Sequence, residues 1–457
     1  MIVMKFGGTS VENAKAIEHA ATIVKGRLGQ SPLVVVSAMA KVTDQLLAMA
    51  RAAGNGDRKA ALKLCRALQE RHYNTAGELL GTALFTQFHS ELGADFETLD
   101  ELLRGIAAVG ELTPRTTDYV AAFGEMLSSK IVTAAFAAMG LASVLVDSRE
   151  CIKTDGAHTR ANPLFEETNQ KLELKVRPLV CSGKVPVMGG FIGSTKAGIT
   201  TTIGRGGSDY SAAIVGAGLG AERIEIWTDV DGMMSTDPNL CRDAVRIKVI
   251  SFDEAAELAY FGAKVLHPAT VLPAVQKNIP VYVLNSRNPD CEGTRISARA
   301  PRCRNPFKAI AVKKRITIVD VAAPRMQLAH GFLKTIFEVF DRHRVAVDVV
   351  STSEVSVSLT VDSNESIPAL AADLAKLADV KYEGRKAIVC LVGENLRETA
   401  GITSRVFAEL TDIKIRMISQ GASEINLTFV IEEDAVPEVV LRLHKTFFSD
   451  LDREIFA

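Results

Sequence analysis

The fold class of this chain is set by one stretch, residues 185–221, which reads "VPVMGGFIGSTKAGITTTIGRGGSDYSAAIVGAGLGA". A short apolar strand at 185–188 ends in two glycines, and a Thr- and Gly-rich segment typical of a hairpin follows. Residues 204–209, "GRGGSD", then open a helix of small residues. Because glycine lets a ligand approach the backbone and a helix N-terminus favours anions, this loop is predicted to bind an anion.

The N-terminus has the same layout. The letters "IVMKFGG" predict a short buried strand that ends at Gly7 and Gly8. Thr9 and Glu12 fit a capping box for the helix that follows. Lys5 stands just before the turn, where its ammonium can reach the same anion, although an ordinary turn with a solvated lysine is the alternative. The chain contains no GxxxxGK[ST] pattern, so neither loop is a P-loop.

Strands and helices alternate to about residue 285, which predicts a doubly wound α/β domain with a mostly parallel sheet between helix layers. In such a sheet, ligands bind beyond the carboxyl ends of the strands. The residues expected there are Lys5, Gly7, Gly8, Ser37, Thr43, Gly204 to Asp209, Thr228 and Asp229. Glu125 lies among apolar residues of a predicted helix, where it needs a cationic partner unless it is solvated at the helix edge.

Composition excludes several other classes of protein. The 457 residues carry a formal net charge of −1, so neither nucleic acid nor an anionic membrane is an expected partner. No apolar run of about 18 residues lacks charge, and the N-terminus lacks the layout of a signal peptide. The seven cysteines form no CxxC pair, which predicts reduced thiols in a cytoplasmic protein, without a disulfide framework or a zinc site.

The last part of the chain contains an internal repeat. The segment 297–308, "SARAPRCRNPFK", is basic and contains proline, which predicts a linker. Beyond it, residues 331–362 match residues 401–432. Each copy predicts a strand, a helix, two strands and a helix, which is the layout of a small α+β unit.

Six segments resemble the signature segments of aspartate kinases and occur in that family's order: "KFGGTS", "VVVSAM", "FGEMLSS", "GRGGSDYSAA", "WTDVDGMMSTDP" and "ELAYFGAKVLHPAT". The resemblance implies the amino-acid-kinase fold and transfer of the ATP γ-phosphoryl group, with Mg²⁺, to the β-carboxylate of L-aspartate. The product would be 4-phospho-L-aspartate, on the route to lysine, threonine and methionine. Because the chain ends at Ala457, a monofunctional enzyme without a homoserine dehydrogenase half is expected.

The two repeats resemble tandem ACT domains, which have a ferredoxin-like α+β fold and bind amino acids; units that only dimerise are the alternative. The implied division is a catalytic domain at 1–298 and ACT domains at 313–385 and 386–457. Strand 306–312 is a candidate member of the second ACT domain. A homo-oligomer, at least a dimer through the ACT domains, is the expected assembly.

The resemblance also implies roles for single residues. The implied catalytic residues are Lys5, Asp209, Gly7 and Gly8. The residues implied to bind aspartate are Thr43, Glu125, Arg205 and Ser208. The residues implied to bind ATP are Lys5, Gly7, Gly8, Ser37, Thr228, Asp229, Met234, Asp237, Lys264 and Val265. Met234 stands where many relatives have Tyr, and Asn239 where many have Arg.

No general base is expected, because the substrate carboxylate, with a pKa of about 3.9, is already an anion at neutral pH. Asp209 is therefore expected to orient Lys5. No metal site made by the protein is expected, since Mg²⁺ would be held mainly by ATP and water.

Relatives with this tail bind feedback lysine at the first ACT copy. The matching positions are Met326, Phe332, Leu333, Val347, Asp348, Thr352, Ser353, Glu354 and Val355. Asp348 and Glu354 can meet a cationic amino acid, whereas Leu328 and Ala329 replace the His and Ser of some lysine-inhibited relatives. Lysine is the predicted effector; threonine, or no inhibition, stays open.

Two other functions compete with this interpretation. A kinase for glutamate or N-acetylglutamate shares the chemistry, but an acetylated substrate has no ammonium for Glu125. A non-catalytic amino-acid sensor is the second alternative, against which Lys5, Arg205 and Asp209 count.

Overall fold

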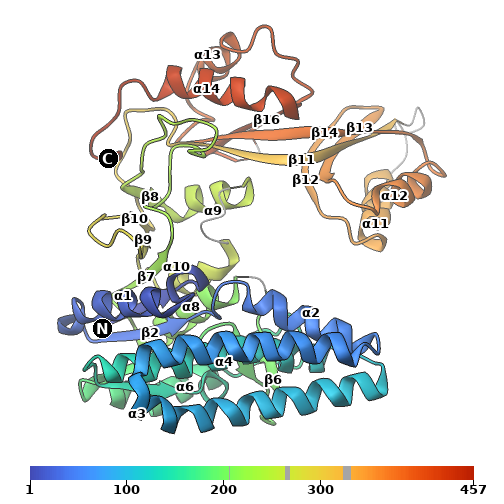
Figure 1. The fold of residues 1–457 in the computed structure, drawn as a ribbon. Coiled ribbons are helices and arrows are strands. Elements are labelled where there is room, and N and C mark those ends of the chain that lie inside the picture. The colour runs from blue at the N-terminus through green and yellow to red at the C-terminus, as the bar shows by residue number, and fades with distance from the viewer. Residues whose placement is uncertain (205, 263–267, 323–330, 422) are drawn as a thin grey trace. The chain divides into compact units, whose positions relative to one another are not determined.

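The computed structural model describes residues 1–204, 206–262, 268–322, 331–421 and 423–457 (Figure 1). The chain divides into two compact units. Unit 1 comprises Met1–Met233 and Val265–Arg299, and unit 2 comprises Met234–Lys264 and Ala300–Ala457. Residues 234–262, which the sequence analysis assigns to the catalytic domain, thus lie in unit 2. The predicted domain boundaries stay a prediction, because compactness does not by itself define a functional domain.

Unit 1 contains the doubly wound sheet. Its strands are β1 (Ile2–Phe6), β2 (Pro32–Val36), β3 (Ser143–Val146), β4 (Val185–Gly189), β7 (Arg223–Thr228), β9 (Val281–Asn285) and β10 (Thr294–Ser297). They are ordered β3-β4-β2-β1-β7-β9-β10, and neighbours are parallel except β9 and β10. The predicted mostly parallel sheet is confirmed. The strands β5 (Ile192–Ser194) and β6 (Thr200–Thr202) form the predicted hairpin.

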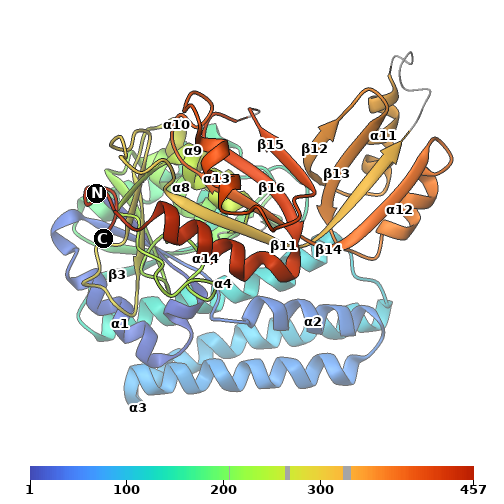
Figure 2. The same cartoon turned by 90° about the horizontal axis from the view of Figure 1, so that it is seen from above.

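Helices cover this sheet, and Figures 1 and 2 show α2, α3 and α4 running alongside one another. The helices of unit 1 are η1 (Gly8–Val11), α1 (Ala14–Lys25), η2 (Leu28–Gln30), α2 (Val42–Gly54), α3 (Arg58–Val109), α4 (Pro114–Ala138), α5 (Ser148–Cys151), α6 (Phe165–Lys175), α7 (Arg177–Cys181), α8 (Gly207–Leu219), η3 (Pro268–Val271) and α10 (Leu272–Gln276). The strand residues of β1 and β2 are all buried, as expected for a sheet covered on both faces.

The predicted capping box of Thr9 and Glu12 is wrong. A short 3₁₀ helix, η1, occupies this stretch, and α1 begins only after Asn13, whose side chain accepts a hydrogen bond from the Ala16 amide at 2.9 Å. The buried Ser10 hydroxyl lies 2.7 Å from the Ser286 hydroxyl, so residue 10 belongs to the turn after β1 and not to α1.

Helix α4 is the one helix among the described residues whose length and apolar composition would suffice to cross a membrane. Of its most apolar 18-residue window, 72% is buried inside the structure, as in the core helix of a globular domain.

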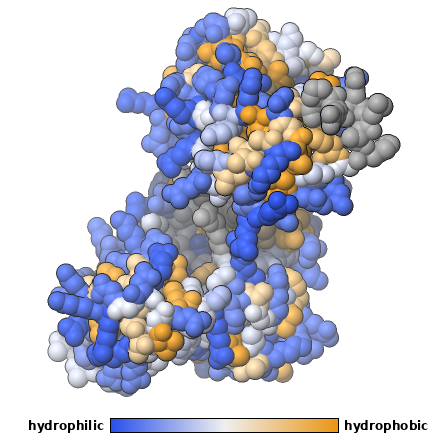
Figure 3. Space-filling model, turned by 90° about the vertical axis from the view of Figure 1, so that its right-hand side faces the viewer, coloured by the Kyte–Doolittle hydropathy of each residue, from blue (hydrophilic) through white to orange (hydrophobic). Residues whose placement is uncertain are grey.

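On the face shown in Figure 3, hydrophilic side chains predominate and apolar side chains gather in separate patches.

Unit 2 is built on a six-stranded antiparallel sheet with the order β12-β13-β11-β14-β16-β15. Its elements are β8 (Val249–Ser251), α9 (Phe252–Tyr260), β11 (Ala309–Ala322), α11 (Phe332–Arg342), β12 (Val347–Thr352), β13 (Ser356–Asp362), α12 (Ile367–Leu374), β14 (Asp379–Val392), α13 (Ile402–Ala408), β15 (Met417–Gln420), β16 (Asn426–Glu432), η5 (Glu433–Ala435) and α14 (Val436–Phe447). The two helix–strand–strand–helix copies confirm the predicted repeat.

Strands β11 and β14 run through both halves of this sheet. Residues 309–313 of β11 pair with 388–392 of β14, and residues 316–322 pair with 379–386, with register shifts on either side of Ile316. Figure 2 shows α11 and α12 beside one end of these strands and α13 and α14 beside the other.

The predicted linker at 297–308 is wrong at its end. Phe307 and Lys308 are fully buried in unit 2. The Lys308 ammonium lies 3.0 Å from a Glu254 carboxylate oxygen and 2.5 Å from one of Glu394. A buried cation needs such partners, and this double ion pair anchors the start of β11 to the first turn of α9.

Candidate active site

A cavity of about 620 Å³ lies in unit 1 at the carboxyl ends of β1 and β2 and the N-termini of α2 and α8. Such an edge is where ligands bind in a doubly wound sheet. The predicted site residues among those that line it are Lys5, Gly8, Ser37, Thr43, Glu125, Gly204, Gly206, Gly207, Ser208 and Asp209. The structure therefore brings the two glycine-rich loops predicted from the sequence, and a distant glutamate, to one cavity.

The cavity contains a nearly buried ion pair. The Lys5 ammonium lies 2.6 Å from the Asp209 carboxylate, and their side chains are 10% and 16% exposed. Lys5 lies in β1, opposite Val35 of β2 and Ile226 of β7. Asp209 lies in the first turn of α8. The sheet thus fixes the lysine, and the helix start fixes its counter-ion.

The N-terminus of α8 reaches the cavity because glycines remove the side chains in its way. Gly206, with φ of 71°, ends the loop before the helix, and Gly206, Gly207 and Ser208 all line the cavity. A Cβ atom on Gly190 would lie 2.7 Å from both Cα and Cβ of Ser208, so only glycine lets β4 and α8 come this close. Amides at a helix start favour an anion at this place.

Glu125 lies in α4 and is 3% exposed. Burial raises the pKa of its carboxyl to about 8, although hydrogen bonds from the Ala38 and Glu125 amides and the charge of Lys5 act in the opposite direction. Its Oε2 atom has no hydrogen-bond partner among the described residues. A buried carboxyl with an unpartnered oxygen is suited to a cationic group of a ligand.

The two glycines after β1 differ in the hydrogen bonds of their amides. The Gly7 amide donates to the Trp227 carbonyl oxygen at 2.9 Å, so this amide stabilises the fold. The Gly8 amide donates to no other described residue. A Cβ atom on Gly8 would lie 3.0 Å from the Ala38 carbonyl oxygen, so a larger residue would disturb the cavity wall.

The residues predicted for ATP are divided between the units. Ser37 follows β2, while Thr228 ends β7 and is followed by Asp229; all three belong to unit 1. Met234 and Asp237 belong to unit 2, where Asp237 accepts hydrogen bonds from the backbone and side chain of Asn239. Arg205, Lys264 and Val265 lie outside the described residues.

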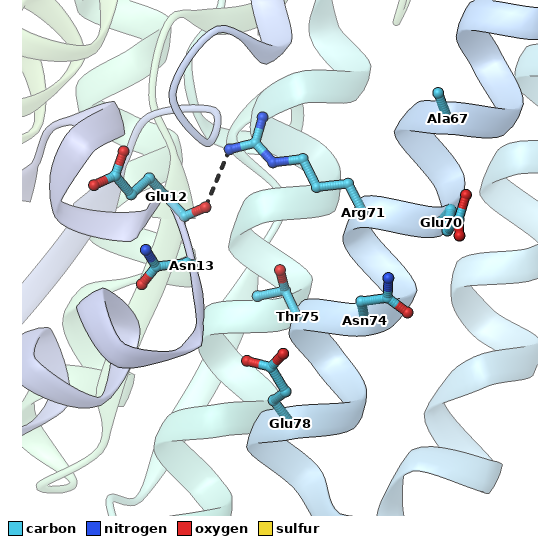
Figure 4. A pocket seen from close by; sticks show the side chains of 8 residues that line it. All are labelled: Glu12, Asn13, Ala67, Glu70, Arg71, Asn74, Thr75 and Glu78. Atoms are coloured by element: carbon cyan, nitrogen blue, oxygen red, sulfur yellow. Dashed lines mark hydrogen bonds between the residues drawn. The ribbon is translucent and has the colours of Figure 1, made fainter.

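Arg71 of α3 is a residue that the sequence analysis did not select. Its guanidinium donates to the Ala40 carbonyl oxygen at 2.8 Å and to that of Glu12 at 3.1 Å, the second of which is drawn in Figure 4. It therefore ties together the turns that follow β1 and β2. A second cavity of about 400 Å³ lies beside it, lined by Glu12, Asn13, Ala67, Glu70, Arg71, Asn74, Thr75 and Glu78.

The residues predicted for the effector lie in unit 2. Phe332 and Leu333 begin α11, Val347, Asp348 and Thr352 lie in β12, and Ser353, Glu354 and Val355 form the turn into β13. Met326 lies outside the described residues.

Asp348 is already paired inside unit 2. Its carboxylate oxygens lie 2.7 and 2.8 Å from the Lys313 ammonium, and the Tyr260 hydroxyl donates to it at 3.1 Å. Burial disfavours the charge of Lys313, but hydrogen bonds to Asp348 and Asp362 outweigh it and raise the pKa of Lys313. The sequence analysis did not identify Lys313 as a partner of Asp348.

Comparisons with known proteins agree with the fold. The model of the amino acid kinase family matches residues 1–285, and an ACT domain model matches residues 389–447. Unit 1 is thus built on an amino acid kinase domain. The chain belongs to the aspartokinases within the amino acid kinase family, which confirms the resemblance found in the sequence.

Two curated relatives illustrate this membership. Aspartokinase 1, chloroplastic, of Arabidopsis thaliana is 36% identical over 98% of this chain and 80% of its own length. Lysine-sensitive aspartokinase 3 of Escherichia coli is 36% identical over 98% of this chain and 99% of its own length.

Two solved structures are similar across the chain. Escherichia coli aspartokinase III in complex with aspartate and ADP, in the R-state, gives a TM-score of 0.84 at 34% identity and covers 98% of this chain and 100% of that one. The same enzyme in complex with lysine and aspartate, in the T-state, gives a TM-score of 0.85 at 34% identity. This match covers 98% of this chain and 99% of that one.

Proposed function

We propose that this protein transfers the γ-phosphoryl group of ATP to the β-carboxylate of L-aspartate and releases 4-phospho-L-aspartate and ADP. The observation that carries the proposal is one cavity lined both by the Lys5–Asp209 ion pair and by Glu125, whose Oε2 atom has no hydrogen-bond partner among the described residues. The similar Escherichia coli structure, solved with aspartate and ADP, supports the choice of substrates.

The main obstacle to this reaction is repulsion between two anions. The substrate carboxylate is ionised at neutral pH, so its oxygen attacks the γ-phosphorus without a base, and the bond from that phosphorus to the β-phosphate oxygen breaks. Lys5 supplies the positive charge that stabilises the transferring oxygens. Asp209 holds the Lys5 ammonium and takes no proton.

The α-groups of aspartate are proposed to bind in the same cavity. Glu125 receives the α-ammonium, because its unpartnered oxygen lacks a cation. Arg205 binds the α-carboxylate through its planar guanidinium, and Thr43 and Ser208 donate hydrogen bonds. This division of roles positions the β-carboxylate toward Lys5.

ATP is proposed to bind through the Gly8 amide, Ser37, Thr228 and Asp229, together with Gly7, Met234, Asp237, Lys264 and Val265. Mg²⁺ bound with ATP would neutralise phosphate charge, and it would be held mainly by ATP and water. The described residues contain no group of three or more His, Cys, Asp or Glu side chains able to hold a metal ion.

Lysine is proposed as the feedback inhibitor, bound at the first ACT copy by the effector residues named above. The T-state complex of Escherichia coli aspartokinase III with lysine supports this choice.

Assembly as at least a dimer is proposed through the ACT domains, where α11 exposes Leu333 and Phe337 one helical turn apart. A cytoplasmic location is proposed because all seven cysteines are free thiols.

An assay of ADP release with aspartate, glutamate and N-acetylglutamate as separate acceptors tests the proposal. Turnover with aspartate alone is the expected result. Turnover with either other acceptor would make this protein a different carboxylate kinase, and no turnover with any of them would favour an amino-acid sensor. Repeating the assay with lysine and then threonine tests the effector.

A further inference from the structure

Asp118 is a buried carboxylate in the wall of the active-site cavity that the proposed chemistry does not use. It lies on α4 about two helical turns before Glu125, on the same helix face, and its side chain is 1% exposed. The two carboxyl groups therefore look similar in the sequence, yet the structure gives them different surroundings.

The oxygens of Asp118 are fully engaged, in contrast to those of Glu125. The Thr159 amide donates to both at 3.0 and 3.1 Å, and the Thr202 hydroxyl donates to Oδ1 at 2.5 Å. His158 contacts Oδ2 through Nδ1 at 2.7 Å. Since a carboxylate only accepts, Nδ1 carries the hydrogen. Asp118 thus has no acceptor left for a substrate ammonium, which leaves that role to Glu125.

The partners of Asp118 form one side of the cavity. Thr159, Thr202 and Gly204 line it together with Asp118. Thr159 has φ of 70°, a left-handed conformation that threonine adopts only under constraint, and its amide is held by Asp118. The Ala161 amide donates to the Thr202 carbonyl oxygen at 3.0 Å, which joins this loop to β6.

This wall leads directly to the loop that carries Arg205. The Thr159 carbonyl oxygen lies 3.5 Å from the position of a Cβ on Gly204, and Gly204 itself has φ of 82°. One carboxylate on α4 thus fixes the strained residue that packs against the residue before Arg205.

We propose that Asp118 is a positioning residue for the aspartate substrate: it fixes Thr159 and Thr202, so that the cavity wall they form with Gly204 is held in place for aspartate. The inference rests on the proposed function of this cavity. His158 is not among the described residues that line the cavity, so the His158–Asp118 pair is a brace and not an acid–base pair.

The test is steady-state kinetics of Asp118→Asn, Thr202→Val and the double variant, with Asp100→Asn as the matched control on α3. Asp118→Asn replaces one carboxylate oxygen, which accepts hydrogen bonds, by an amide NH₂, which donates. The donors that face this side chain are the Thr159 amide, the Thr202 hydroxyl and His158 Nδ1. We expect the aspartate KM to rise at least tenfold while the ATP KM stays within twofold. The double variant is expected to match Asp118→Asn within twofold, because both substitutions remove the same contact.

An unchanged aspartate KM, a parallel rise of both KM values, or multiplicative effects in the double variant would overturn the inference. Should Asp118→Asn fail to fold, His158→Phe and His158→Gln decide the question. Gln can still donate to Asp118, so the aspartate KM should rise for Phe and stay near wild type for Gln; equal values for the two variants would overturn the brace. Wild-type protein without aspartate turnover would overturn both this inference and the proposed function, whereas wild-type turnover with unaltered variants removes this inference alone.

Discussion

The Lys5 ammonium and the Asp209 carboxylate lie 2.6 Å apart, although one belongs to the first strand of the chain and the other to the first turn of α8. The pair is nearly buried, so the lysine reaches the cavity as a fixed charge and not as a mobile surface group. Pre-organised charge of this kind costs no rearrangement during phosphoryl transfer.

Replacing this fixed charge tests its role. Lys5→Met should lower kcat by about 10²–10³-fold, the usual loss when one electrostatic donor to a transition state is removed. Stopped-time assays of ADP formation measure this value. Lys25→Met, at the end of α1, is the control and should keep wild-type kcat. Wild-type kcat in Lys5→Met would remove Lys5 from the mechanism.

The raised pKa of Glu125 predicts that a proton is released when aspartate binds. Without ligand, burial keeps the pKa of its carboxyl at about 8, so it is mostly protonated at pH 7. An α-ammonium beside it favours the carboxylate, and binding should therefore release close to one proton. Titration calorimetry in buffers of different ionisation enthalpy measures this number. Glu125→Gln should release none and raise the aspartate KM; equal proton release in the variant would contradict the assignment.

The same carboxyl makes stability depend on pH. Between its usual pKa of 4.5 and about 8, the folded protein binds more protons at Glu125 than the unfolded chain does. The contribution of this group to the free energy of unfolding therefore falls as pH rises through that window. Thermal unfolding of ligand-free protein at a series of pH values should show a smaller decline in Glu125→Gln, and an unchanged profile would contradict this reading.

Gly190 is expected to tolerate no side chain. In Gly190→Ala the new Cβ would lie 2.7 Å from Cα and Cβ of Ser208, and relief of this contact must move the start of α8. Overpacking of this kind costs about 1–3 kcal/mol of folding stability. Because Ser208 lines the cavity, its displacement should also raise the aspartate KM. Gly29→Ala is the control, because nothing lies within 4 Å of its new Cβ. Equal kinetics in the two variants would show that the approach of β4 and α8 is not needed.

Lys313 is expected to compete with a cationic effector for Asp348. Lys313→Met frees a carboxylate that is 4% exposed, so inhibition by lysine should occur at a several-fold lower concentration. Inhibition curves at fixed aspartate and ATP measure the change. Lys314→Met, at the exposed neighbouring position, should leave the curve unaltered. A higher or identical inhibitory concentration in Lys313→Met would exclude this competition.

Much of the fold could be read from the sequence because the signals are local. Apolar strands followed by glycines and helix starts predicted the parallel sheet, and a matching repeat predicted the two α+β copies. The start of α1 was predicted wrongly, because Thr9 and Glu12 fit the pattern of a capping box, whereas Asn13 is the residue that caps the helix. The end of the linker was missed for another reason: Lys308 is charged, and tertiary pairing with Glu254 and Glu394 permits its burial.

The candidate site could be predicted at positions where the residue type is unusual for an ordinary turn or helix. Glycines around Arg205, a lysine before two glycines and a glutamate in an apolar helix all pointed to charge recognition. Asp118 and Arg71 were not selected, because an aspartate near a helix start and an arginine in a long helix are usually solvated. Their importance depends on which backbone groups they meet, such as the Thr159 amide and the Ala40 carbonyl.

The central claim is that one cavity binds both ends of aspartate, with Glu125 at the α-ammonium and Lys5 at the β-carboxylate. Trapping the acyl phosphate with hydroxylamine, for aspartate and for N-acetylaspartate, tests it most directly. We predict a β-hydroxamate from aspartate and ATP with wild-type protein, almost none with Lys5→Met, and almost none from N-acetylaspartate. Equal yields from the two acceptors, or an unaltered yield with Lys5→Met, would contradict the account.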